Sequence, residues 1–244
     1  MGDKAKNTKG RFSKNYATAL LKIDAAKAYK VGEAFTLLPT VAFAKFDETV
    51  DVAFSLGVDP KHADQMVRGA LVLPHGTGKT LKVAVLAKGE KAREAEAAGA
   101  DFVGSDDLIE KITGGWLGFD KMIATPDQMA PLSKVAKILG PRGLMPNPKT
   151  GTVTMDVARA VKEQKLGKVE YRTEKTGIVH VVIGRKSFGS DKLRENFIAI
   201  ANTLIRAKPP TSKGVYLKST TVSATMSPGI RLDSSDIMVA TGNG

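Results

Sequence analysis

One glycine-rich segment of this chain has residue types that could hold a phosphate group. The run Pro74-His75-Gly76-Thr77-Gly78-Lys79-Thr80 ends like a nucleotide-binding P-loop, in which backbone amides at the start of a helix hold the phosphates. That motif needs a glycine five positions before its last one, where this chain has Leu73, and residues 81–87 have the apolar character of a strand. The segment is therefore interpreted as a connection between domains, with a phosphate-loop nucleotide-binding protein as the alternative.

Residue types that serve catalysis or metal binding are scarce and scattered. The sequence has no cysteine, which excludes disulfides and thiolate metal sites. Its three histidines, His62, His75 and His180, lie far apart and outside any HxxxH or HExxH spacing. No GxSxG motif and no spaced cluster of carboxylates accompanies them. We therefore expect a binding protein and not an enzyme, with no metal, no cofactor and no small-molecule substrate.

A lysine and an aromatic ring lie at the entrance to a predicted strand. Lys45 and Phe46 come shortly before Thr49, where an alternating apolar pattern begins. RNA-binding proteins use such a pair because the ring can stack on a base while the lysine holds a phosphate. A core position for Phe46 is the alternative.

A basic β-hairpin is predicted in the last third of the chain. The apolar runs 169–172 and 178–183 flank the sequence Thr-Glu-Lys-Thr-Gly, a spacing that suits a hairpin connection. Arg172, Lys175 and His180 lie within nine positions of one another with few acids nearby. This composition favours a phosphate site over a surface salt-bridge cluster.

Hydroxyl side chains alternate along the last predicted strand. Ser219, Thr221, Ser223 and Thr225 share one face by strand alternation, and Met226 then opens a Met-Ser-Pro-Gly turn that exposes backbone amides. Such a row can exchange hydrogen bonds with phosphate and 2′-hydroxyl groups. A solvated strand face would look the same.

A second segment is rich in residues that interrupt helices and strands: residues 140–151 contain three glycines and three prolines. Arg142 and Lys149 could meet phosphate there. We prefer to interpret the segment as a rigid return crossing between domains.

The elements that must position these residues follow two patterns. Between residues 81 and 139, short apolar runs alternate with helical ones, which is typical of a small doubly wound parallel sheet. The predicted strands there are 82–87, 102–103 and 122–124, and the predicted helices are 90–98, 106–112 and 126–139. On either side, the pattern predicts a largely antiparallel sheet with one amphipathic helix. Its elements are strands at 49–56, 68–73 and 215–226, the hairpin above, and a helix at 191–207.

The positive charge is concentrated near the two chain ends. The 244 residues carry a net charge of +12, and 42% of them are apolar, as in ordinary globular proteins. Residues 1–30, 31–75, 76–158 and 159–244 carry +6, −3, +1 and +8. This distribution suits one basic domain built from both termini around a neutral insertion. A polyanionic partner is expected, with nucleic acid ahead of an anionic membrane.

No segment has the features of a membrane span or a signal peptide. Lys22, Asp24 and Lys27 interrupt every apolar run behind the basic N-terminus, and no uncharged stretch approaches the length of a span. We therefore expect a soluble, cytoplasmic protein without a membrane partner.

Taken in order, these segments resemble a bacterial-type large-subunit ribosomal protein of the L-one family, the protein of the mobile stalk beside the tRNA exit site. The resemblance covers nearly the whole chain. The matching segments are Val67-Arg68-Gly69 with residues 73–79, residues 140–151, Lys175-Thr176-Gly177, and Thr225-Met226.

The resemblance implies a fold and a set of domain boundaries. The fold is an α+β basic domain built from both chain ends, with an inserted Rossmann-like α/β domain. Residues 1–74 and 158–244 would form the discontinuous RNA-binding domain, and residues 75–157 the insertion. Hinge crossings are expected near 70–80 and 151–160.

The resemblance also implies partners and contact residues. The partners are large-subunit ribosomal RNA, exit-site tRNA whose release the protein assists, and the messenger RNA of its own operon, which it represses. Carried over to matching positions, the RNA-binding residues are Lys45, Phe46, Thr49, Arg172, Lys175, His180, Ser219, Thr225 and Met226.

Two positions depart from the family pattern. Ser227 replaces a glycine that usually follows Met226, which puts any contact through bare backbone there in doubt. The hairpin reads Arg-Thr-Glu-Lys where Arg-Asn-Asp-Lys is common, so both cations are kept and the polar turn residues change. A basic DNA-binding protein is a further alternative, weakened by the lack of a recognition-helix motif.

Overall fold

The computed structural model describes residues 12–62 and 64–242, which separate into two compact units. The first unit contains Met1–Val67, Leu73–Thr77 and Tyr171–Gly244. The second contains Arg68–Val72 and Gly78–Glu170. The basic residues Lys4, Lys6, Lys9 and Arg11 lie outside the described residues.

The described part of the first unit is built on an antiparallel sheet with the strand order β7-β1-β8-β9. The strands are β1 (Thr49–Leu56), β7 (Ile178–Arg185), β8 (Leu217–Ala224) and β9 (Ile230–Leu232). In β1 every second residue, beginning with Val50, is buried. The predicted strand at 49–56 and the largely antiparallel sheet are confirmed.

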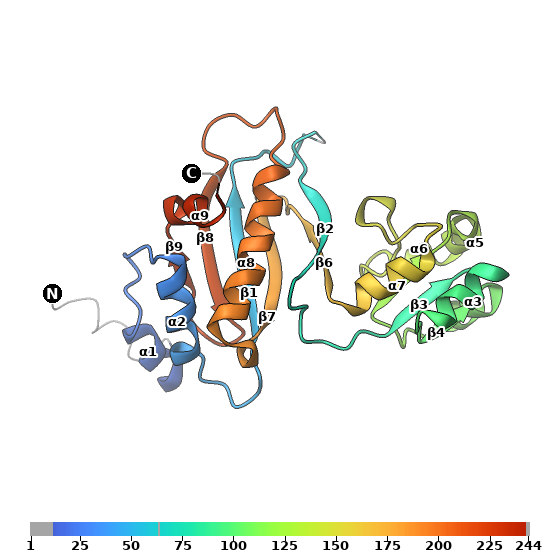
Figure 1. Ribbon diagram of the computed structural model, residues 1–244, viewed down its shortest axis with the longest axis horizontal. Helices are drawn as coiled ribbons and strands as arrows, with labels where there is room; N and C mark the ends of the chain where they lie inside the picture. Colours follow the sequence, from blue (N-terminus) through green and yellow to red (C-terminus); the bar gives the residue numbers. More distant parts are fainter. Residues whose placement is uncertain (1–11, 63, 243–244) are drawn as a thin grey trace. The chain divides into compact units, whose positions relative to one another are not determined.

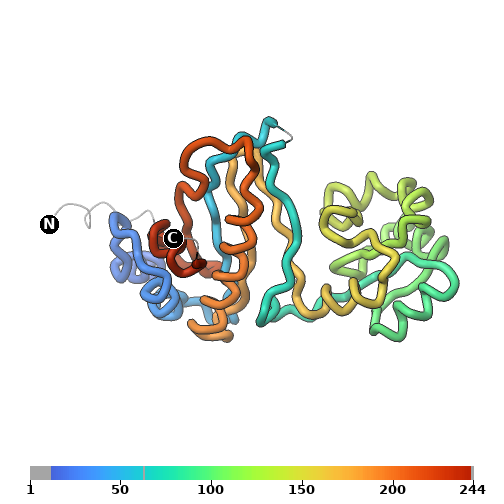
Figure 2. Tube along the Cα trace, turned by 45° about the horizontal axis from the view of Figure 1, so that its top comes forward, coloured from blue at the N-terminus to red at the C-terminus, as the bar shows by residue number. Residues whose placement is uncertain are grey.

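The buried face of this sheet is covered by the helices α2 (Val31–Val41), α8 (Gly189–Arg206) and α9 (Ser234–Ala240). A further helix, α1 (Lys14–Leu21), packs against α2. The α8 helix runs along the sheet (Figure 1), and its Phe197 stacks on Phe54 of β1 with ring centroids 5.8 Å apart. Near the chain ends, α2 and α9 lie side by side (Figure 2), and the Val31 amide donates a hydrogen bond to Asp236 at 2.7 Å.

The opposite face, which we call the open face, keeps partly exposed side chains. Because strand residues alternate between faces, this face is formed by the residues between the buried ones. They are Thr49, Asp51, Ala53 and Ser55 in β1, Ile178, His180 and Val182 in β7, Ser219, Thr221 and Ser223 in β8, and Arg231 in β9.

The second unit contains a parallel sheet with the order β4-β3-β5. Its strands are β3 (Val83–Leu86), β4 (Phe102–Gly104) and β5 (Lys121–Ala124), and its longer helices are α3 (Glu90–Ala97), α4 (Asp106–Thr113) and α7 (Val157–Lys165). Ala84 and Leu86 belong to one apolar cluster, while Val83 and Val85 belong to another. Both faces of the sheet are therefore covered, as the alternating pattern predicted.

The chain changes units between residues 67 and 78, close to the first expected crossing at 70–80, but its return crossing lies later than the expected 151–160. The α7 helix belongs to the second unit because Val157, Ala160 and Val161 are buried with Val83 and Val85. The boundary expected at 157 therefore moves to residue 170, and residues 140–151 form no crossing. Leu144 and Met145 of that segment instead pack on the core of the second unit.

Two predicted elements are wrong. The helix expected over 126–139 is divided into η2 (Pro126–Gln128), α5 (Met129–Leu132), η3 (Ser133–Val135) and α6 (Ala136–Leu139). Pro131 contributes to the first break, because it has no amide to donate to the carbonyl of residue 127. The hairpin expected over 169–183 does not form a ladder: β6 (Lys168–Arg172) pairs with β2 (Arg68–Val72), and β7 pairs with β1. Within the described chain, Thr173 and Val179 form an isolated bridge.

Candidate nucleic-acid interface

The loop before β1 meets the turn after β8 at one end of the sheet. The Thr49 amide donates to the Thr225 hydroxyl at 3.1 Å, and the Thr225 amide donates to the Thr49 carbonyl at 3.0 Å. The Thr225 hydroxyl in turn donates to the same carbonyl at 3.2 Å. Segments 176 positions apart in sequence thus form one surface, which we call the strand-end surface: Lys45, Phe46, Thr49, Thr225 and Met226.

A buried carboxylate holds this surface together. Glu48 is 0% exposed, and its two carboxylate oxygens accept hydrogen bonds from the amides of Ala44 at 2.7 Å and Met226 at 3.0 Å. Its carbonyl oxygen accepts from the Lys186 amide at 2.8 Å. Sequence reasoning missed Glu48, because a glutamate next to a strand start is expected to be solvated.

Two apolar side chains of the strand-end surface face solvent. Phe46 is 56% exposed and Met226 is 51% exposed. The alternative that placed Phe46 in the core is therefore wrong. Large apolar side chains exposed beside polar groups are suited to stacking on or packing against bases.

The hydroxyl groups of the turn are largely used within the protein. Thr225 uses its donor and one acceptor position on Thr49, which leaves one acceptor position for a ligand. The Ser227 hydroxyl is folded back and accepts from the Ala224 amide at 2.9 Å. The serine that replaces the family glycine therefore closes the turn.

The remaining predicted contacts lie further along the open face. His180 is opposite Ala53 at the middle of β1, and Ser219 is opposite Ser55 near its far end. Since β1 has eight residues, its two ends are about 23 Å apart. The nine predicted residues therefore do not form one cluster but extend along the sheet.

Arg172 and Lys175 lie beside a hollow at this far end. Pro60, Lys61 and Met66 line it together with residues 172–176, and its volume is about 940 Å³. Lys61 adds a third exposed cation, which sequence reasoning missed. Three cations around one concave surface are suited to a phosphate-bearing ligand.

Comparison with known proteins identifies the family. A model of the ribosomal protein L1p/L10e family matches residues 38–228 of this chain. The large ribosomal subunit protein uL1 of Bdellovibrio bacteriovorus is 58% identical over 229 residues, which are 94% of this chain and 98% of that protein. The chain belongs to the ribosomal protein L1p/L10e family. The resemblance noted from the sequence is thereby confirmed, and the protein is a bacterial-type ribosomal protein.

The glycine-rich segment of this L1p/L10e protein has no P-loop geometry. Residues 78–82 lead into strand β3, and no helix begins directly after Lys79. The preceding part is attached to helix α8, where the Asn196 side chain accepts from the His75 amide at 3.0 Å and donates to the Gly76 carbonyl at 3.1 Å. Without a helix start after the glycines, the amides that would hold phosphate are missing.

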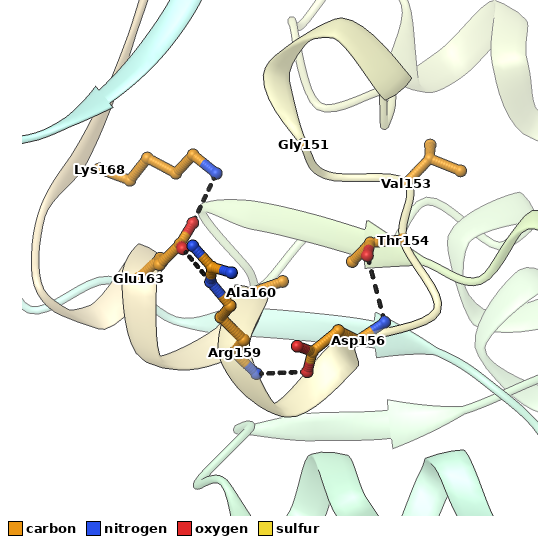
Figure 3. Close-up of a pocket in the computed structure, with 8 residues that line it drawn as sticks. All are labelled: Gly151, Val153, Thr154, Asp156, Arg159, Ala160, Glu163 and Lys168. Carbon is orange, nitrogen blue, oxygen red and sulfur yellow. Dashed lines mark hydrogen bonds and ion pairs between the residues drawn. The ribbon is translucent and has the colours of Figure 1, made fainter.

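A small polar groove in the second unit of this L1p/L10e protein has its charges compensated internally (Figure 3). Its volume is about 280 Å³. Lys168 and Arg159 each donate to Glu163 at 2.8 Å. The hydrogen bond from Lys168, and to a lesser degree that from Arg159, holds the pKa of Glu163 below its ordinary value against the opposing effect of burial. With its carboxylate neutralised in place, the groove is not arranged to attract an ion.

Across residues 12–62 and 64–242, no group of three or more histidine or carboxylate side chains is placed to hold a metal ion. No helix in the described part of the chain is both long and apolar enough to cross a membrane.

Proposed function

We propose that this protein is a structural component of the large ribosomal subunit and binds its ribosomal RNA through the first unit. The uL1 relative is named as a protein of that subunit, and its similarity extends over nearly the full length of both chains. The observation that carries the RNA site is the strand-end surface, where exposed Phe46 and Met226 flank Thr49 and Thr225. The protein would act in the cytoplasm, where ribosomes work.

The contact residues have distinct roles in this proposal. Phe46 stacks on a base or packs on a ribose, and Lys45 holds phosphate. Thr225 and Met226 contribute discrimination, because the turn presents a hydroxyl and an apolar side chain together. Lys175 adds phosphate contacts at the far end of the sheet.

Three further residues complete the proposed RNA-binding set: Arg172, His180 and Ser219. His180 and Ser219 lie on the open face, and Arg172 lies beside the hollow, so an RNA helix that begins at Thr49 would pass all of them. The sheet offers this path over a length of about 23 Å.

We propose three finer functions on the resemblance and the charge distribution. The protein assists release of deacylated tRNA from the exit site. It also represses translation of its own operon by binding a messenger RNA that imitates the ribosomal site. The α/β insertion moves relative to the basic domain around the crossings of the chain. Binding of the operon leader in competition with the ribosomal fragment tests the second of these.

Matched methionine substitutions test the RNA site. Met226→Ala is expected to weaken binding of the cognate ribosomal RNA fragment, whereas Met155→Ala, which truncates a methionine 55% exposed in the second unit, should leave it unchanged. Binding to an unrelated hairpin at the same salt concentration measures specificity. Equal effects of the two substitutions would contradict the proposed surface.

A further inference from the structure

A β-bulge in β7 turns one arginine toward the strand-end surface. Thr49 is opposite Arg185 and Val50 is opposite Gly184, yet Asp51 is opposite Val182. Ile183 is therefore an extra residue that shifts the alternation of the strand. Without it, Arg185 would point to the helix-covered face; with it, Arg185 shares the open face with Thr49, its direct partner.

Close packing around Gly184 fixes this bulge. Its φ of 149° lies in a region that favours glycine, and a Cβ atom there would lie 2.8 Å from a ring carbon of Phe188 and 3.0 Å from a methyl carbon of Leu193. A residue with a side chain would have to displace one of them. The backbone that re-aims Arg185 is thus built into the packing of the first unit.

The Arg185 guanidinium has few partners within the protein. Its Nε is buried and has no hydrogen-bond partner in the described residues, and its contact with a carboxylate oxygen of Asp47 is 3.9 Å long. Asp47 already accepts hydrogen bonds from the amide and the hydroxyl of Ser187, at 3.0 and 2.7 Å. The long contact to Asp47 therefore leaves most of the five donors of the guanidinium unused.

The neighbouring cation is in a different situation. The Lys186 ammonium donates a hydrogen bond to the Ala42 carbonyl at 2.7 Å, and the Lys186 amide donates one to the Glu48 carbonyl at 2.8 Å. Lys186 therefore supports the loop before β1. Of these two adjacent cations, Arg185 is the one whose donors are left over for a ligand.

We propose that Arg185 binds a backbone phosphate of the RNA at the strand-end surface. This assignment rests on the proposed RNA-binding function and adds a residue to it. A planar guanidinium presents paired N–H donors that match the oxygens of a phosphate, and the Thr49 side chain beside it offers a hydroxyl to the same region. Phe46 and Met226 supply the apolar contacts of the strand-end surface. Arg185 adds a second positive charge to the one that Lys45 supplies there.

Three substitutions in the full-length chain test the assignment. Arg185→Gln should weaken binding of the cognate ribosomal RNA fragment roughly 10- to 100-fold. It should also make the slope of log K against log salt shallower by about 0.7 to 0.9. Arg185→Lys should keep the slope and lose only part of the affinity, because the charge remains and the paired donors do not. Arg194→Gln is the matched control, since Arg194 is exposed on α8, which covers the opposite face.

Each result has a definite consequence. Wild-type affinity for Arg185→Gln would overturn the assignment of Arg185 and leave the proposed function standing. Equal weakening by both Arg185 substitutions without a change in salt slope would also overturn it, because the arginine would then act through local structure. A wild-type chain that does not bind the fragment would overturn the proposed function, and this assignment with it.

Discussion

Removing the charge of Glu48 should loosen the strand-end surface without altering its exposed residues. Glu48→Gln keeps the length and shape of the side chain but replaces one carboxylate oxygen by an amide nitrogen, which cannot accept a hydrogen bond. One of the two amides, of Ala44 or Met226, then faces a donor instead of an acceptor. Because Glu48 is 0% exposed, water cannot replace the lost acceptor.

The expected loss follows from these contacts. A hydrogen bond to a charged group contributes about 1.5 to 3 kcal/mol, and a buried amide left without an acceptor costs about 1 to 3 kcal/mol. Since these effects overlap, we expect the free energy of unfolding of the first unit to fall by about 2 to 4 kcal/mol. Glu33→Gln is the control, because Glu33 is 52% exposed in a surface ion pair with Lys27 and should contribute less than about 1 kcal/mol.

Urea unfolding distinguishes the two units. The chain has one tryptophan, Trp116, which packs against Phe102 and Phe119 in the second unit, so its fluorescence reports on that unit. Circular dichroism reports on both units. Glu48→Gln should move the dichroism transition to lower urea, leave the fluorescence transition in place, and weaken RNA binding. An unchanged dichroism midpoint, or an equal shift for Glu33→Gln, would refute the role given to Glu48.

Four further outcomes are expected. Thr225→Val should reduce affinity for the cognate RNA by about 1 to 3 kcal/mol and more than for an unrelated hairpin, and equal losses for both RNAs in binding titrations would make the turn purely structural. Ser227→Gly should keep RNA binding and lower the free energy of unfolding by about 1 kcal/mol, because the hydroxyl that closes the turn is lost; a gain in stability in urea unfolding would contradict this. Gly184→Ala should destabilise the first unit by about 1 to 3 kcal/mol, seen as a lower dichroism midpoint, since the site has no room for a Cβ. The pKa of Glu163 is lowered from 4.5 in the folded chain, so the stability that its ionised carboxylate contributes is present above pH 4.5 and is lost as the pH falls through the lowered pKa. Glu163→Gln should therefore flatten the acid limb of the fluorescence-detected stability profile against pH, and an unaltered acid limb would contradict this role of Glu163.

The sequence by itself determined the features that depend on local pattern and composition. Alternation from Val50 to Leu56 fixed the central strand, because an apolar residue at every second position can bury one face only. Two features of the sequence were enough to argue against a P-loop. That motif requires a glycine where this chain has Leu73, and a helix where this chain has an apolar run after Lys79. The residues chosen at 45–49 and 225–226 do lie together, although only the family resemblance joined those two segments.

Strand partners could not be obtained from the sequence. The spacing of 169–172 and 178–183 fits a hairpin, and the turn at Gly177 does exist, with a φ of 81°. Yet β6 pairs with β2 and β7 pairs with β1, because pairing depends on which strand edges the fold brings together. Local propensity describes a strand but not its neighbour.

Tertiary structure alone decided the roles of Glu48 and Arg185. A glutamate and an arginine at strand ends have the composition of ordinary surface, and neither gave a signal in the sequence. Glu48 is buried because two loops far apart in the chain both present amides to it. Arg185 faces outward because one extra residue in β7 shifts the alternation against β1. Both roles arise from contacts between segments more than a hundred residues apart, which no local pattern encodes.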